Sequence, residues 1–161
     1  MSLSGAAAGK PEFRKEKEAM EQSLLYPVTS KTRRAVSLDG MWRFQFDEKS
    51  IGEQEGWEGE LPNPVSIPVP SAFADLFTDK KSREYAGDFW YARDFFVPGE
   101  WRDKEILLRF GSVTHRAKVF VNGVLVTEHE GGFLRFNAVV TDKVRYDEEN
   151  RVSVLVNNEL S

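Results

Sequence analysis

The sequence predicts an all-β fold, a jelly-roll type of β-sandwich with about seven to nine short strands. Apolar and polar residues alternate with a period of two in several short runs, which is the pattern of half-buried strands. Turn signals containing Gly, Asn or Asp separate these runs. No convincing helical pattern interrupts them after residue 26, so the fold class follows from strand periodicity and turn spacing together.

Length and composition limit the functions that the chain can have. It has 161 residues, which suits one domain plus a tail. The absence of cysteine excludes disulfides, thiolate metal ligands and a cysteine nucleophile. Asp and Glu (26) outnumber Lys and Arg (22), which argues against nucleic acid or an anionic membrane as a partner. No apolar run approaches the roughly 20 residues of a membrane helix.

Residues 1–25 differ from the rest and are expected to form a charged extension. Eight charges of both signs occupy residues 10–21. Phe13, Met20 and Leu24 lie at helical spacing, so a short amphipathic helix is one interpretation and a partly disordered segment is the other. The first three residues are compatible with a remnant of cloning. We therefore place the domain at residues 26–161.

The first strands of this domain follow from alternation. Trp42, Phe44 and Phe46 alternate with polar residues after an Asp-Gly turn signal. Residues 65–69 alternate too, but two prolines restrict that run to a sheet edge. Residues 89–97 carry large apolar side chains on both faces, which predicts a strand buried on two sides.

The second half of the sequence shows the same alternation of apolar and polar residues. Asn122-Gly123 separates two β-branched runs, and because both turn residues need positive φ, this dipeptide predicts a tight hairpin. Alternation or apolar runs predict further strands, at residues 106–110, 117–121, 124–127, 133–140 and 152–156.

Few residues in these strands carry recognisable chemistry. His115 and His129 have neither the spacing nor the neighbours of a metal site, so both are interpreted as structural residues that are hydrogen-bonded near a loop, and no metal or cofactor is expected. The carboxylates lie mostly in turns or in the extension, where solvation explains them. No nucleophile elbow or phosphate-binding loop is present in the sequence. The residues alone therefore predict no catalytic site.

Two aromatic residues are candidates for stacking on a sugar. Trp57 lies in a polar loop between Gly56 and Glu58, and Tyr85 precedes Ala86-Gly87 in another loop. Trp42 and Trp90 lie within predicted strands and are expected in the core. Aromatic count alone does not separate core rings from exposed platforms.

Six segments, in order and at matching spacing, resemble the N-terminal sugar-binding domain of the bacterial β-glucuronidases of glycoside hydrolase family 2. The likeness covers about five-sixths of the chain, and six motifs in register make it specific. The segments are Leu38–Phe44, Tyr85–Arg93, Arg109–His115, Lys118–Gly123, Glu128–Phe133 and Val156–Leu160.

The resemblance implies a parent enzyme in which this jelly roll precedes an immunoglobulin-like sandwich and a (β/α)₈ barrel. The barrel would supply both catalytic glutamates of a retaining mechanism, so no residue of this chain is assigned a catalytic role. The likeness places Asn157, Asn158 and Glu159 nearest to the sugar pocket, or else at a strand end with a structural role. It also implies that the sandwich is incomplete at its C-terminal end and that the parent is a homo-oligomer. A bacterial cytoplasmic location is expected from the absence of cysteine, of a signal peptide and of Asn-x-Ser/Thr sequences.

Two other interpretations stay open. One is a free-standing carbohydrate-binding module, or a module for oligomer contacts, because fold does not fix function. The other is a different family 2 glycosidase, such as a β-galactosidase. A reading frame that continues past Ser161 into a barrel would separate the enzyme from the module.

Overall fold

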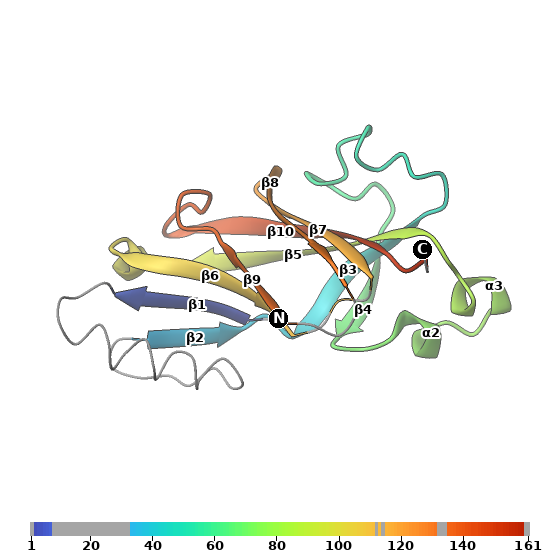
Figure 1. The fold of residues 1–161 in the computed structure, drawn as a ribbon, viewed down its shortest axis with the longest axis horizontal. Helices are drawn as coiled ribbons and strands as arrows, with labels where there is room; N and C mark the ends of the chain where they lie inside the picture. Colours follow the sequence, from blue (N-terminus) through green and yellow to red (C-terminus); the bar gives the residue numbers. More distant parts are fainter. Residues whose placement is uncertain (1, 8–32, 112, 114, 132–134, 160–161) are drawn as a thin grey trace.

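The fold is a two-layer β-sandwich (Figure 1). A computed structural model describes residues 2–7, 33–111, 113, 115–131 and 135–159. Among these, all paired strands are antiparallel, in a four-stranded sheet of order β2-β1-β6-β9 and a six-stranded sheet of order β4-β3-β5-β10-β7-β8. The predicted all-β sandwich is therefore confirmed. The strands are β1 (Ser2–Ala7), β2 (Arg33–Ser37), β3 (Gly40–Asp47), β4 (Val65–Val69), β5 (Asp88–Val97), β6 (Lys104–Phe110), β7 (Arg116–Val121), β8 (Val124–Glu130), β9 (Phe136–Val139) and β10 (Glu148–Asn157).

Helical structure in the described residues is short and peripheral. It comprises α2 (Phe73–Leu76), α3 (Lys80–Arg83) and a 3₁₀ turn, η1 (Gly99–Trp101). Asp79 caps α3 by accepting a hydrogen bond from the Ser82 N–H at 2.8 Å, and that bond lowers the pKa of the Asp79 carboxyl. None of these helices, among the described residues, is long and apolar enough to cross a membrane.

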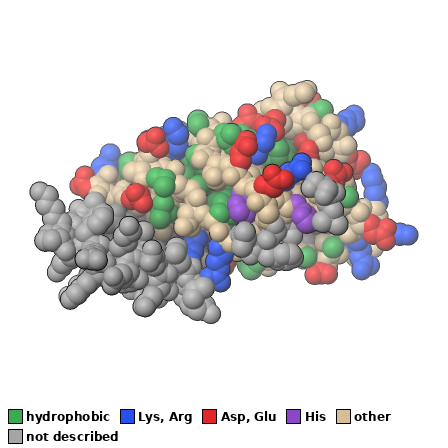
Figure 2. Space-filling view, in the orientation of Figure 1, with side chains coloured by type: hydrophobic (Ala, Val, Ile, Leu, Met, Phe, Trp, Pro, Cys, Tyr) green, Lys and Arg blue, Asp and Glu red, His purple; other side chains and the backbone are tan. Residues whose placement is uncertain are grey.

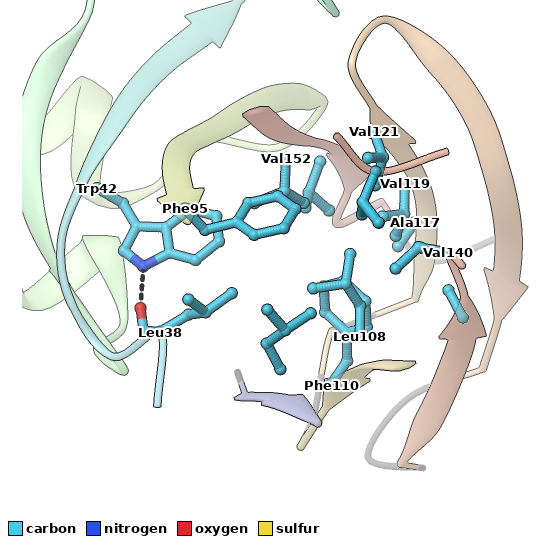
Figure 3. Close-up of a cluster of buried hydrophobic side chains, with 14 of the residues drawn as sticks. Leu38, Trp42, Phe95, Leu108, Phe110, Ala117, Val119, Val121, Val140 and Val152 are labelled. Carbon is cyan, nitrogen blue, oxygen red and sulfur yellow. Dashed lines mark hydrogen bonds between the residues drawn. The ribbon is translucent and has the colours of Figure 1, made fainter. Parts of the chain in front are cut away.

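The main hydrophobic core fills the space between the two sheets (Figure 3). Trp42 and Phe44 of β3 and Leu108 of β6 are at most 1 % exposed. The Trp42 indole N–H donates to the Leu38 carbonyl at 2.7 Å, so its only polar atom is satisfied inside the core. The alternation that predicted β3 thus identifies the residues that face the second sheet.

The Asn122-Gly123 hairpin is confirmed. Both residues have positive φ, 49° and 80°, and Val121 lies opposite Val124 across the two-residue turn. The Asn122 side chain also accepts a hydrogen bond from the Arg151 N–H at 3.0 Å and donates to Asn150 at 2.9 Å. Asparagine therefore fixes the hairpin and also ties it to β10.

The six-stranded sheet is covered on its outer face as well. Trp90 and Ala92 of β5 point away from the main core, yet they are at most 2 % exposed because the segment after β3 packs over them. The prediction of two-sided burial for residues 89–97 is therefore confirmed in the first half of β5. It is wrong at Phe96, which is 51 % exposed.

Asp47 anchors this covering segment to the sheet. It is 3 % exposed and accepts hydrogen bonds from the N–H groups of Ile51 (2.9 Å) and Gly52 (2.8 Å) and from the Trp90 indole (3.2 Å). A Cβ at residue 52 would lie 2.6 Å from the Asp47 carboxylate, so only glycine fits. One buried carboxylate thus fixes the start of the loop.

The first residues differ from the expectation. Ser2–Ala7 was expected in a charged extension, but it forms strand β1 between β2 and β6, and Leu3 is 1 % exposed in the main core. The expectation of a partly disordered or helical segment is therefore wrong for Ser2–Ala7, whereas a cloning origin for the first three residues stays a prediction. Local sequence could not show this, because β1 depends on backbone pairing with distant strands. The predicted helix over residues 13–24 lies outside the described residues.

Candidate functional site

Two groups of predicted site residues meet where β10 ends. Asn158 Nδ2 donates to the Tyr85 carbonyl at 2.9 Å, and Asn158 Oδ1 accepts from the Gly87 N–H at 2.9 Å. Asn157 Nδ2 donates to Asp88 Oδ1 at 2.7 Å. Both amide side chains therefore hold the loop that leads into β5.

Glu159 differs from the two asparagines. Its N–H donates to Asn157 Oδ1 at 3.0 Å, whereas its side chain is exposed. Of the three residues predicted nearest to a sugar pocket, Glu159 is the one whose side chain is exposed. The side-chain amides of Asn157 and Asn158 form hydrogen bonds within the domain.

The second stacking candidate, Tyr85, is half-buried. Its ring packs on Phe46 with centroids 4.5 Å apart, and its hydroxyl donates to the Asp88 carbonyl at 2.8 Å. Burial, together with nearby carboxylates such as Asp88, raises the pKa of the Tyr85 phenol to about 12. Phe46 therefore covers part of the Tyr85 ring, and the phenol stays protonated at physiological pH.

Trp57 is not a stacking platform, which corrects the prediction. It is 7 % exposed and packs edge-on against Trp90, with ring centroids 6.4 Å apart. Its loop is polar in sequence, but the loop folds back over the outer face of the sheet and turns the indole inward. A ring buried in this way cannot receive a sugar.

A cleft of about 360 Å³ opens beside these residues, over β7, β8 and the end of β10. Four carboxylates and two cations line it, together with Ala117, His129, Leu155 and Asn157. The carboxylates belong to Glu53, Asp88, Glu128 and Glu130, and the cations to Arg116 and Lys118. On the face of the molecule drawn in Figure 2, acidic and basic side chains are similarly intermixed.

The two cations of the cleft are already paired. Lys118 Nζ lies 2.7 Å from Glu53 Oε1, and Arg116 Nε lies 3.3 Å from Glu130 Oε1. The hydrogen bond that Lys118 donates to Glu53 raises the pKa of Lys118, with burial opposing it in part. An anionic ligand would have to displace these carboxylates, so the cleft is poorly suited to an acidic sugar.

A second ion cluster lies between β3, β5 and β10. Asp94 accepts hydrogen bonds from Arg43 (3.1 Å) and Arg151 (3.0 Å). Burial raises the pKa of the Asp94 carboxyl, but the hydrogen bonds and charges of the two arginines outweigh it and hold the pKa below its usual value. This cluster ties three strands together on an exposed face.

The histidines do not form a site. His129 stacks on Phe136 with centroids 4.2 Å apart, and its buried Nε2 makes no hydrogen bond within the part of the chain that the structure describes. The prediction that His129 is hydrogen-bonded is therefore wrong for this atom. Among the described residues, no three His, Asp or Glu side chains converge as metal ligands. The hydrogen bonds and ion pairs of these described side chains hold loops and strands in place.

Residues 35–160 match the family model described as "Glycosyl hydrolases family 2, sugar binding domain". The chain belongs to this family. The β-glucuronidase of Streptococcus agalactiae is 42 % identical over 137 residues, which cover 85 % of this chain and 22 % of that protein. Human β-glucuronidase is 34 % identical over 155 residues, covering 88 % of this chain and 24 % of that protein.

The fold of this family 2 domain also matches solved structures. The crystal structure of Ruminococcus gnavus β-glucuronidase superimposes with a TM-score of 0.83 at 54 % identity, covering 84 % of this chain and 23 % of that chain. The same enzyme has been solved in complex with D-glucuronic acid. The chain thus spans about a quarter of the length of the relatives that it matches.

The charged cleft was missed from the sequence, although a signal for it exists. In a two-residue hairpin, Lys118 lies opposite Glu128 and Arg116 opposite Glu130. Counting outward from Asn122-Gly123 gives this pairing approximately, but a register shift between Val119 and Phe120 displaces it by one residue. Glu53 comes from the covering loop and could not have been placed from sequence.

Proposed function

We propose that this chain is the N-terminal, non-catalytic sugar-binding domain of a retaining β-glucuronidase that hydrolyses β-D-glucuronides. The observation that carries the proposal is the match of residues 35–160 to the family 2 sugar-binding domain, together with 54 % identity to the R. gnavus enzyme. The identity is high enough for the relatives' activity to be a reasonable model for the parent protein.

The proposed role of this domain is structural support. The candidate residues support it, because Asn157, Asn158 and Tyr85 bond to the domain itself and Trp57 is buried. We propose that Glu159, with its exposed carboxylate, lies nearest to the sugar pocket of the parent enzyme. Both catalytic glutamates would come from the parent's barrel. This domain would therefore support the other domains of the parent enzyme and would not take part in the reaction itself.

Hydrolysis of a chromogenic β-glucuronide tests whether this domain is non-catalytic. The 161-residue chain is expected to show no turnover above buffer, because the proposal assigns both catalytic glutamates to the parent's barrel and because Glu53 and Glu130 of the cleft are already paired with Lys118 and Arg116. Adding this domain to a parent enzyme that lacks it should restore folding or activity. Turnover by the pure chain would contradict the proposal.

We also propose that the parent acts as a homo-oligomer in the bacterial cytoplasm. The bacterial relatives and the absence of both cysteine and Asn-x-Ser/Thr acceptor sequences support this location. Cell fractionation and light scattering of the parent protein would test the two statements separately. A periplasmic or monomeric parent would contradict the corresponding one.

A further inference from the structure

The β7–β8 hairpin turns at Asn122-Gly123, the one Asn-Gly pair in the sequence. This dipeptide has a reactivity of its own besides its turn preference. The backbone nitrogen that follows an asparagine can attack the side-chain carbonyl carbon, and glycine has no Cβ to obstruct the attack. Each of the other five asparagines precedes a bulkier residue. By sequence, Asn122 therefore carries the side-chain amide that is most prone to this reaction.

The fold holds both polar atoms of this side chain against neighbouring segments. Asn122 Oδ1 accepts from the Arg151 N–H at 3.0 Å, and the Asn122 backbone N–H donates to the Arg151 carbonyl at 2.9 Å. Asn122 Nδ2 donates to the Lys143 carbonyl and to Asn150 Oδ1, both at 2.9 Å. Attack by the Gly123 nitrogen expels Nδ2 as ammonia, so the reaction has to break both of these bonds.

Asn150 is itself unable to adapt to a change at residue 122. It is 1 % exposed, and its Nδ2 donates to the carbonyls of Arg145 (2.8 Å) and Glu148 (3.1 Å). Its Oδ1 also accepts from the Arg145 N–H at 2.7 Å. A flip of the amide would turn its oxygen toward two carbonyls and lose these bonds. Asn150 therefore presents an acceptor to residue 122.

An aspartate at residue 122 would not match these partners. The oxygen that replaces Nδ2 would face the Lys143 carbonyl and Asn150 Oδ1, which are both acceptors. Arg145 Nη2 lies 3.4 Å from Asn122 Oδ1 and would attract the new charge, but Arg145 is exposed and the attraction is screened. An isoaspartate would also lengthen the backbone of a two-residue turn. Either product fits the network less well than asparagine does.

We propose that Asn122 is a latent deamidation site, protected while the hairpin is bound to β10 and reactive each time the hairpin opens. In the open state the Gly123 nitrogen gives up its proton and bonds to Asn122 Cγ. The Cγ–Nδ2 bond then breaks, and Nδ2 leaves as ammonia with a proton taken from the solvent. Water opens the resulting cyclic imide to aspartate or isoaspartate. Because the products fit the network poorly, each conversion makes later opening of the same molecule more frequent.

The first experiment compares the folded chain with the chain unfolded in guanidinium chloride, both at mildly alkaline pH. Peptide mass spectrometry measures the fraction of aspartate and isoaspartate at residue 122. Because only the open hairpin reacts, conversion should be about tenfold or more faster in the unfolded chain. Asn63 is the internal control, since the proline that follows it has no N–H for the ring closure. Equal rates in the two states, or equal conversion of Asn63, would overturn the proposal.

A second experiment tests the protection by Asn150. Asn150→Ala removes the acceptor of one Nδ2 bond without touching Asn122. Asn158→Ala is the matched control, because Asn158 also joins distant segments but lies beyond the opposite end of β10. Each rate of conversion at Asn122 in buffer is divided by that variant's equilibrium constant for unfolding. The corrected rate should be about fivefold or more higher for Asn150→Ala. Equal corrected rates would show that Asn150 does not protect Asn122 and would overturn the proposal.

A third experiment tests the effect of the product. Asn122→Asp should raise the equilibrium constant for unfolding about tenfold or more. Asn63→Asp adds the same charge at an exposed loop position and should change that constant by less than about threefold. If Asn122→Asp does not fold, the unmodified chain is aged in guanidinium chloride and then refolded. The soluble fraction should retain asparagine at residue 122, and the aggregated fraction should be enriched in the products. Equal stability of Asn122→Asp and the unmodified chain, or equal composition of the two fractions, would contradict the proposal.

Discussion

Asn158 and Gly87 exchange two hydrogen bonds, from the Gly87 N–H to Asn158 Oδ1 at 2.9 Å and from the Asn158 N–H to the Gly87 carbonyl at 3.4 Å. The two residues are 71 positions apart in the chain. Their pairing continues the contact between β10 and β5 beyond the last strand residues. The end of β10 is thereby fixed to the loop that carries Tyr85.

Replacing Asn158 should therefore affect stability first. Asn158→Ala leaves the half-buried Gly87 N–H and Tyr85 carbonyl without these partners, which should cost about 1–3 kcal/mol of unfolding free energy. Urea denaturation followed by circular dichroism measures it. Glu159→Ala is the matched control, because its side chain is exposed, and it should change stability by less than about 0.5 kcal/mol. Equal effects of the two variants would argue against a structural role for Asn158.

Trp57 gives a second stability prediction. Trp57→Ala removes a buried indole from the cluster with Trp90 and Phe120 and should destabilise the domain by about 3–5 kcal/mol. Trp57→Phe keeps much of the apolar volume and should cost clearly less. Denaturation curves of both variants provide the measurement. If Trp57→Ala were as stable as the unmodified 161-residue chain, the result would instead indicate an exposed ring.

The Asp94 cluster predicts a pH dependence. Because Arg43 and Arg151 hold the pKa of Asp94 below 3.8 in the folded state, the carboxylate binds fewer protons there than in the unfolded chain. Its stabilising contribution is present above about pH 4 and is lost as the pH falls through the folded pKa. As the pH is lowered from 6 to 2.5, the melting temperature should therefore fall less steeply for Asp94→Asn than for the unmodified chain.

Two comparisons make the pH experiment specific. Asp103→Asn, at an exposed turn, should leave the slope almost unchanged. High salt should reduce the difference caused by Asp94→Asn, because the cluster is partly exposed and is screened. Identical slopes for all three proteins at low salt would show that the cluster does not contribute.

The charge of the cleft predicts the outcome of sugar binding. Calorimetry with sodium glucuronate should show no saturable binding to the chain, because four carboxylates outnumber the two paired cations. The variant Glu53→Gln with Glu130→Gln frees Lys118 and Arg116 and should bind glucuronate measurably better. Saturation of the unmodified chain at micromolar concentrations would favour a free-standing carbohydrate-binding module over a supporting domain.

The parts of the fold that were predicted correctly depend on local signals. Trp42 and Phe44 were placed in the core by alternation, and the β7–β8 hairpin by Asn122-Gly123, because both signals act within a few residues. Trp57 was misplaced because the polarity of its own loop says nothing about the surface onto which the loop folds. The bonds of Asn158 to Tyr85 and Gly87 join segments more than 70 residues apart, so spacing along the chain could not reveal them.

The fold class and the family resemblance can be predicted from the amino-acid sequence, since strand periodicity, turn residues and ordered motifs are local features of the chain. The roles of the candidate residues depend on the folded arrangement. It buried Trp57, turned the amides of Asn157 and Asn158 onto the protein, and paired the cations of the cleft with Glu53 and Glu130. It also placed Ser2–Ala7 inside a sheet. The physical reason is that burial and pairing depend on which distant backbone and side chains become neighbours, and those neighbours exist only after the two sheets have formed.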